Sequence, residues 1–323
     1  MDAILKSSLP LSRGRLLLMG AGLGVLGTVL LTVQLPGDDR FTRALQNAGH
    51  AGLFALLTIV VLPAMRPANT AAPLRPLVVM FVLACLALGV GVELVQSFIG
   101  RQASWKDIAL NMAGVGIGLC LLTSFRPGSS LPLRATAAFV CLLLLAASFT
   151  DPALWWYRQL QRDRQFPVIA AFESPWVNRF ASSSYGSQLA IVPAPAAWSQ
   201  NLSQVARLTL RRRGPWPGLA LVEVYPDWRD YRFLSFEIFS ANPDPLDLSL
   251  RIHDKSHDYR HADRFNRQLR VNPGVNRYTI PLEAVRQAPA GRDMDMRNVH
   301  TLVWFSHRPR HEKVIFFDNV RLL

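Results

Sequence analysis

Two hydrophobic patterns divide this chain near residue 150. The first part contains five long apolar runs, at residues 16–34, 48–64, 77–99, 108–125 and 135–150. Each run approaches the roughly 20 residues that an α-helix needs to cross a hydrocarbon core about 30 Å thick. The sequence therefore predicts an all-α membrane domain of five transmembrane helices over residues 1–150.

After this domain the apolar residues alternate with polar ones, which is the period of a strand with one buried face. Seven segments show the pattern: 206–210, 218–224, 232–240, 246–252, 277–282, 300–306 and 313–322. Turn signals such as Asn242-Pro243 and Asn272-Pro273-Gly274 separate them. We therefore expect an all-β antiparallel sandwich of jelly-roll type over residues 165–323. Residues 151–164, which contain interfacial aromatic residues, are expected to form a membrane-exit linker.

Basic residues are distributed unevenly among the short loops. Lys6, Arg13 and Arg15 precede the first run, and the second and fourth loops are also basic, whereas the alternate loops mix both signs. The positive-inside rule then places the N-terminus in the cytoplasm of a multi-pass protein of the inner or plasma membrane. Five spans place the β-rich domain outside the cytoplasm. A signal peptide is the alternative for the first run, but its length and the lack of an A-x-A-like site favour an uncleaved helix.

Composition and charge limit the partners and cofactors that we expect for this chain. The chain has a formal charge of +13 and 50% hydrophobic residues. Its basic residues are interleaved with acids, so we expect membrane lipids and not nucleic acid as a partner. The three cysteines, Cys85, Cys120 and Cys141, all lie in apolar runs, so the β-rich domain has no disulfide framework. A dinucleotide-like glycine pattern begins at Gly22, but it lies inside an apolar run and is assigned to helix packing, as are Gly114 and Gly118.

Polar residues interrupt three of the predicted spans in pairs: Asn47 with His50, Glu93 with Gln96, and Asp107 with Asn111. Spacings of three or four residues place both members of a pair on one helix face. Polar groups inside a bilayer are costly and usually face a partner or a water-filled cavity. We therefore expect one shared polar site in the outer leaflet, with the turn residue Arg101 as counter-charge. Its candidate members are His50, Glu93, Gln96, Arg101, Asp107 and Asn111.

The segments NAGHAGLFALL (47–57) and VELVQSFIGRQASWKDIALNMAGVGIG (92–118) carry this pattern and resemble the VanZ-like family of membrane proteins, over residues ~15–125. That family is named for low-level glycopeptide-antibiotic resistance. A Lys that relatives often carry near the Gly-His pair is absent here. Three roles are open for the polar residues: an ion-pair lock that fixes helix register, a ligand site, or a catalytic site with His50 or Glu93 as general base.

The β-rich part resembles carbohydrate-binding-module and galactose-binding-like jelly rolls over residues 165–323. Four segments carry the resemblance: AAFESPW (170–176), residues 227–254, PGVNRYTIPL (273–282) and FFDNVRL (316–322). In several such modules an acid in the first strand and an Asp near the last bind structural calcium. The resemblance therefore implies calcium ligands at Glu173 and Asp318, although Asp318 alternatively satisfies only backbone groups in the final turn.

Glycan binding requires aromatic platforms flanked by polar groups. The candidate ligand-binding residues are Trp216, Trp228, Tyr231, Asp254, Arg264 and Asn266, the last three within the predicted loop 253–267. The alternative for Trp228 and Tyr231 is that they seal the edge of the core. His253, His257 and His261 are four apart and raise zinc as a further ligand, but a loop does not secure that spacing.

The sequence contains no nucleophile elbow, Walker loop, HExxH or paired CxxC motif, which favours a binding module over an enzyme. We therefore expect a membrane protein of the cell envelope whose extracytoplasmic sandwich binds a glycan or glycoconjugate, such as an envelope polysaccharide or a lipid-linked glycan. One alternative is an enzyme or carrier that acts on a lipid-linked cell-wall intermediate. The other is a structural membrane protein whose sandwich binds another protein.

Overall fold

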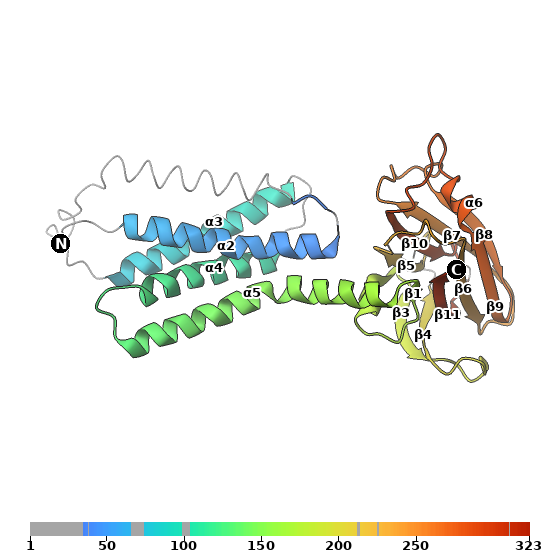
Figure 1. Ribbon diagram of the computed structural model, residues 1–323, viewed down its shortest axis with the longest axis horizontal. Coiled ribbons are helices and arrows are strands. Elements are labelled where there is room, and N and C mark those ends of the chain that lie inside the picture. Colours follow the sequence, from blue (N-terminus) through green and yellow to red (C-terminus); the bar gives the residue numbers. More distant parts are fainter. Residues whose placement is uncertain are drawn as a thin grey trace. The chain divides into compact units, whose positions relative to one another are not determined.

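The computed structural model describes residues 35–37, 39–65, 74–98, 104–211, 214–224, 226–309 and 311–323. The chain divides into two compact units, Met1–Trp156 and Tyr157–Leu323. The first is helical and the second is built mainly from strands (Figure 1).

Four long helices dominate the described part of the first unit: α2 (Arg40–Ala64), α3 (Leu74–Phe98), α4 (Trp105–Ser124) and α5 (Leu131–Gln165), the last of which continues past Trp156 into the residues of the second unit. All four are long and apolar enough to cross a membrane. The described residues thus contain four candidate spans where the sequence predicted five, and the first predicted span, residues 16–34, lies outside them.

The helices extend beyond the apolar runs that predicted them. Asp39 caps α2, because its Oδ1 accepts a hydrogen bond from the Thr42 amide at 2.9 Å, so α2 begins eight residues before the predicted span at 48. The C-terminal end of α5 also extends beyond its apolar run, because the helix continues without a break through residues 151–164. The segment predicted to be an exit linker is therefore α-helical.

Small residues bring α2 and α4 into close contact, as expected for Gly114 and Gly118. A Cβ on Gly114 would overlap the carbonyl of Ala51, and a Cβ on Gly118 would lie 2.5 Å from Cβ of Thr58. Only glycine permits these approaches, which let the two backbones pack directly. The helix α5 adds Cys141 to the same apolar contact region.

The second unit is an antiparallel sandwich of two sheets, in agreement with the predicted fold class (Figure 1). One sheet has the order β3-β4-β11-β6-β9, with β1 paired to β11, and the other has the order β2-β5-β10-β7-β8. The chain passes repeatedly from one sheet to the other, as in a jelly roll. The strands are β1 (Val168–Ala170), β2 (Ala181–Ser184), β3 (Gln188–Pro193), β4 (Gln204–Leu210), β5 (Gly218–Val222), β6 (Phe233–Ser240), β7 (Leu246–Asp254), β8 (Phe265–Val271), β9 (Gly274–Pro281), β10 (Val299–Phe305) and β11 (Lys313–Leu322).

Each of the seven predicted strand segments corresponds to a strand, with ends shifted by up to three residues. The strands β1, β2, β3 and β8 were not predicted, and β8 begins inside the segment predicted to be a loop. The short helices η1 (Val177–Phe180) and α6 (Leu282–Arg286) complete the unit.

Period two places the apolar side chains of both sheets in one core. Trp304 of β10 packs edge-on against Phe236 of β6, with ring centroids 5.2 Å apart, and lies 5.4 Å from the ring of Phe317. All three side chains are fully buried. Aromatic rings of this size supply much of the burial energy of a small core, so the sandwich provides a rigid support for the side chains on its outer faces.

Candidate functional site

A hollow of about 730 Å³ lies on the sheet β2-β5-β10-β7-β8. Its floor consists of outward-facing side chains, which alternate along each strand with the side chains of the core. Phe305 of β10 pairs with Ser249 of β7, which in turn pairs with Gln268 of β8. In the next row, Val303 pairs with Arg251. Apolar and polar groups therefore meet on one face, as in many ligand sites.

Two exposed aromatic rings form one wall of the hollow. Tyr185 follows β2, Trp216 precedes β5, and their ring centroids are 5.7 Å apart in an edge-to-face arrangement. The hydroxyl of Ser184 helps to hold this pair in place, because it donates a hydrogen bond to the backbone carbonyl of Trp216 at 3.2 Å. Gly214 approaches Tyr185 so closely that a Cβ would lie 2.8 Å from Cβ of Tyr185.

Polar side chains complete the lining and are ordered by one another. Gln268 donates to the Ser249 hydroxyl at 2.9 Å, and Arg264 donates to the side-chain oxygen of Asn266 at 3.0 Å. Asn266 also donates to the carbonyl of His261. These hydrogen bonds leave further donors of the arginine and amide groups for a ligand.

Burial and like charges set the protonation of two groups on this face. Burial, followed by the repulsion from Arg264, lowers the pKa of Arg251 from its usual value. Arg251 donates from Nε to Nδ1 of His253 at 3.2 Å, so Nδ1 of His253 acts as an acceptor. Burial, together with the charge of Arg251, lowers the pKa of His253 to about 3. His253 is therefore neutral near pH 7, and the charge of the face resides on its arginines.

The structure divides the six predicted ligand-binding residues into two groups. Trp216, Arg264 and Asn266 line the hollow. Trp228 does not, because its ring is fully buried in the core and its Nε1 donates to the carbonyl of Val224. Tyr231 packs against the same core, edge-on to Phe166. Trp228 and Tyr231 therefore do not serve as aromatic platforms of this hollow. They have the alternative role of sealing the edge of the core.

Asp254, the sixth candidate, is a buried structural residue. Arg292 binds its carboxylate through two nitrogens, at 2.5 and 2.9 Å, and the amide of Asp295 donates to it at 2.7 Å. The third nitrogen of Arg292 binds Asp263 at 2.6 Å. This bidentate arrangement fixes two loops against each other and leaves Asp254 unavailable to a ligand.

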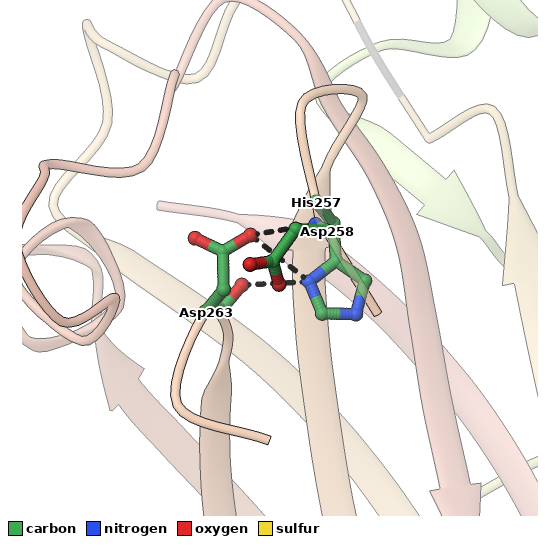
Figure 2. A group of neighbouring side chains, drawn as sticks. All are labelled: His257, Asp258 and Asp263. Atoms are coloured by element: carbon green, nitrogen blue, oxygen red, sulfur yellow. Dashed lines mark hydrogen bonds and ion pairs between the residues drawn. The ribbon is translucent and has the colours of Figure 1, made fainter. Parts of the chain in front are cut away.

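The zinc hypothesis is not supported by the positions of the three histidines. His253 and His257 stack with ring centroids 4.6 Å apart, whereas His261 is exposed and lines the hollow. A different group, His257, Asp258 and Asp263, has ligand-type atoms within 4.8 Å of one another (Figure 2).

Most atoms of this group already have protein partners, whereas Nε2 of His257 is buried without a hydrogen-bond partner among the described residues. Nδ1 of His257 lies 2.7 Å from the carbonyl oxygen of Asp263, and the Asp263 carboxylate accepts a hydrogen bond from the Asp258 amide (Figure 2). The same carboxylate also accepts a hydrogen bond from Arg292. The Arg292 guanidinium holds the pKa of Asp263 well below its usual range. The contacts describe a loop lock, and a metal would have to displace them.

The predicted calcium ligands lie in different surroundings. Asp318 is buried in β11 and its Oδ2 accepts hydrogen bonds from Asn201 at 2.6 Å and from Ser203 at 3.0 Å. Burial nevertheless raises the pKa of Asp318. Glu173 is exposed. Calcium at Glu173 and Asp318 stays a prediction from resemblance.

In the helical unit, the structure brings part of the predicted polar site together. Nδ1 of His50 lies 3.1 Å from Oδ1 of Asn111, and both side chains are buried. Glu93 accepts a hydrogen bond from the Ser104 amide at 2.7 Å and thus ties the end of α3 to the start of α4. Asp107 is buried in the first turn of α4. Arg101 and the Gln96 side chain lie outside the described residues.

The lining residues of the hollow that were not among the predicted candidates include Tyr185, Arg251 and Gln268. Arg251 could have been found from the sequence, since it lies in a predicted strand at an outward position between the apolar residues Leu250 and Ile252. Tyr185 carried none, because its serine-rich segment shows no alternation. The polar pattern of β8 concealed both the strand and Gln268.

No protein-family model matches the chain, and no curated protein matches it either. Among solved structures, an exo-β-agarase is 16% identical, with a TM-score of 0.39, over 48% of this chain and 25% of its own. The family 11 carbohydrate-binding module from Clostridium thermocellum, in complex with a β-1,3-1,4-mixed-linked tetrasaccharide, is 16% identical over 44% of this chain and 86% of its own, with a TM-score of 0.33. The family 30 carbohydrate-binding module of a Clostridium thermocellum cellulosomal cellulase is 15% identical over 45% and 91%, with a TM-score of 0.33. This chain thus spans a quarter of the agarase, and the VanZ-like resemblance stays a prediction.

Proposed function

We propose that this chain is a multi-pass membrane protein of the cell envelope whose β-sandwich, on the outer side of the membrane, binds a glycan or glycoconjugate. The observation that carries the proposal is the exposed Tyr185 and Trp216 pair beside a hollow lined with hydrogen-bonding side chains. The rings are 51% and 44% exposed, so each offers a surface to a ligand.

The chemistry of the hollow matches that of a sugar. A pyranose ring has an apolar face of C–H groups and a rim of hydroxyls, so it pairs an aromatic ring with polar groups at the side. Here Ser249, Asn266 and Gln268 supply donors and acceptors next to the apolar floor. A volume of about 730 Å³ also falls within the range of about 300–1,000 Å³ that is typical of small-ligand sites.

The test is glycan-array binding by the full chain in detergent micelles, followed by affinity measurements on any hit. We expect Trp216→Ala and Tyr185→Ala each to weaken binding about tenfold, since loss of one stacking ring costs on the order of 1.4 kcal/mol, a factor of ten. Tyr259→Ala is the matched control, because Tyr259 is 89% exposed and does not line the hollow. Equal losses in all three variants, or no binding by folded protein to any glycan, would contradict the proposal.

The helical unit supports a second candidate, an enzyme or carrier that acts on a lipid-linked cell-wall intermediate. The favouring observation is a buried polar group between helices: His50 bonds Asn111, and Oε1 of Glu93 is buried without a hydrogen-bond partner among the described residues. This proposal includes five spans, a cytoplasmic N-terminus and a VanZ-like polar site in the outer leaflet. A His50→Gln variant that inserts and folds normally yet loses a cell-wall phenotype supports it, whereas an unchanged phenotype assigns the cluster to helix packing.

A further inference from the structure

The hollow on the β-sandwich has a one-sided charge. Among the described residues that line it, Arg251, Arg264 and Arg267 are cationic and none is Asp or Glu. None of these arginines takes part in an ion pair of the described residues. The hollow thus concentrates positive charge on one face.

Two other arginines of the same unit, Arg270 and Arg277, bind carboxylates. Arg270, next to the hollow on β8, binds Asp247 at 3.0 Å, and Arg277 on β9 binds Glu237 at 2.9 Å. Arg251 and Arg264, in contrast, donate to the neutral groups of His253 and Asn266. Carboxylates thus pair with Arg270 and Arg277, whereas none of the described carboxylates pairs with the arginines of the hollow.

An unpaired cation that is partly desolvated gains the most from an anion brought by a ligand. Arg251 projects from the floor of the sheet, and burial together with the charge of Arg264 already disfavours its charged form. A planar guanidinium offers two parallel N–H groups that match the oxygens of a carboxylate, sulfate or phosphate. Two such groups, Arg251 on β7 and Arg264 directly before β8, define a receptor for an acidic substituent next to the stacking rings.

We propose that the ligand of this hollow is an acidic saccharide, with a uronate, sulfate or phosphate group held by Arg251 and Arg264 while a sugar ring stacks on Trp216 or Tyr185. This inference rests on the glycan-binding function proposed above and specifies its ligand class. The aromatic pair lies at one wall only, which fits a saccharide better than a single-stranded nucleic acid whose successive bases each need a stacking surface.

Matched ligand pairs test the charge requirement with the full chain in detergent micelles. The probes are oligogalacturonate and its methyl ester, alginate oligouronates and their methyl esters, and heparin oligosaccharide with its desulfated form. Each pair keeps the sugar backbone and removes charge. We expect at least one acidic member to bind tenfold or more tightly than its neutral or less charged counterpart. Its affinity should fall as salt rises from 50 to 500 mM, because the screening length for solvent-exposed charges shortens from about 14 Å to about 4 Å in that range.

Protein variants assign the effect to the hollow. Arg251→Gln and Arg264→Gln should each weaken binding of the acidic probe about tenfold and leave binding of its neutral counterpart within twofold. Arg270→Gln is the control, because it removes the same charge from β8 at an exposed residue that does not line the hollow.

The outcomes separate this inference from the function on which it rests. If neutral glycans bind as tightly as acidic ones and Trp216→Ala still weakens binding about tenfold, glycan recognition holds and the acidic ligand class is wrong. If neither member of any pair binds and the wider array is also silent, both proposals fail. If a single-stranded oligonucleotide of equal charge competes as well as the acidic glycan, the hollow is a general polyanion site and the inference is overturned.

Discussion

At the scale of single residues, Arg292 connects two acids that would otherwise be buried without a countercharge. Asp254 is fully buried and bound through both oxygens, and the Arg292 side chain is 30% exposed. Its pKa is raised, chiefly by the hydrogen bond to Asp254. Removing one partner of such a pair leaves an uncompensated buried charge.

We therefore expect Arg292→Met to lower the free energy of unfolding by about 2–3 kcal/mol, less than the roughly 3–5 kcal/mol of a fully buried pair because solvent reaches Arg292. Tryptophan fluorescence during guanidinium unfolding of the full chain in micelles measures the change. Arg286→Met is the control, since Arg286 pairs with Glu283 at the surface and surface pairs contribute little. An equal effect of both variants would contradict a special role for the Arg292 lock.

His253 predicts a pH dependence of stability. Its pKa is lowered to about 3 in the folded protein, from 6.5, by burial and by Arg251, with His257, His300 and Arg264 adding to the effect. The unfolded chain therefore binds more protons between these values, so the contribution of His253 is present above pH 6.5 and is lost as the pH falls towards 3.

We expect His253→Gln to flatten the fall of stability between pH 6.5 and 4.5 by about 1–2 kcal/mol, because one pKa unit corresponds to about 1.4 kcal/mol and the site is partly solvated. Gln keeps an acceptor for Arg251 and does not titrate. Below pH 4.5 the paired carboxylates, including Asp263, also lose their contribution, and both proteins should weaken alike. Parallel curves for the two proteins between pH 6.5 and 4.5 would show that His253 does not carry this dependence.

At the scale of elements, the contact of α2 with α4 depends on the absence of a side chain at Gly114. We expect Gly114→Ala to destabilise the helical unit by about 1–3 kcal/mol, the usual cost of overpacking, because the new Cβ meets the rigid Ala51 carbonyl. Gly52→Ala on α2 is the control, since nothing lies within 4 Å of a Cβ there. The temperature at which the monodisperse protein is lost in detergent measures the stability of both variants. Equal melting temperatures would mean that α2 and α4 can move apart without a loss of stability.

Elements were predictable where one physical signal dominated. Long apolar runs predicted α2 to α5, but their ends depend on capping and packing, so Asp39 extended α2 beyond its apolar part. Strict alternation predicted β7, whose Leu248, Leu250 and Ile252 are all fully buried. The strand β8 was missed because its outward residues include Asn266 and Gln268, and its polar composition resembles a loop.

The candidate site was predictable only by residue type. Trp216 and Trp228 have the same chemistry and both stand near turns, yet one is 44% exposed and the other is fully buried. Neither residue lies in a strand, so the tertiary packing of their loops decides between them, and a single segment does not encode that packing. The hollow joins residues from β2 to β10, so its cationic lining emerged only from the assembled sheet.

At the scale of the whole molecule, the net charge of +13 is the sum over two units in which the basic residues have different surroundings. In the helical unit, basic residues lie in loops such as the one with Arg126, where they bear on membrane orientation. In the sandwich they include the arginines of the hollow. Both proposals, glycan binding and an outer-leaflet polar site, require the sandwich to lie outside the cytoplasm.

Single-cysteine labelling tests that orientation and the number of spans together. In a background with Cys85, Cys120 and Cys141 replaced by alanine, we expect a membrane-impermeant maleimide to label Tyr259→Cys in intact spheroplasts but not Ser130→Cys. Both positions are exposed, so access to the reagent and not burial decides. Because α5 alone separates these two positions, they should never be labelled from the same side if α5 spans the bilayer.

Ser7→Cys then counts the spans. If residues 16–34 cross the membrane, five spans place residue 7 opposite the sandwich, and Ser7→Cys should react only after permeabilisation. If they do not cross, α2 to α5 provide four spans and residue 7 reacts from the same side as Tyr259→Cys. Labelling of Ser130→Cys with protection of Tyr259→Cys would place the sandwich in the cytoplasm, and the proposed recognition of an envelope glycan would fail with it.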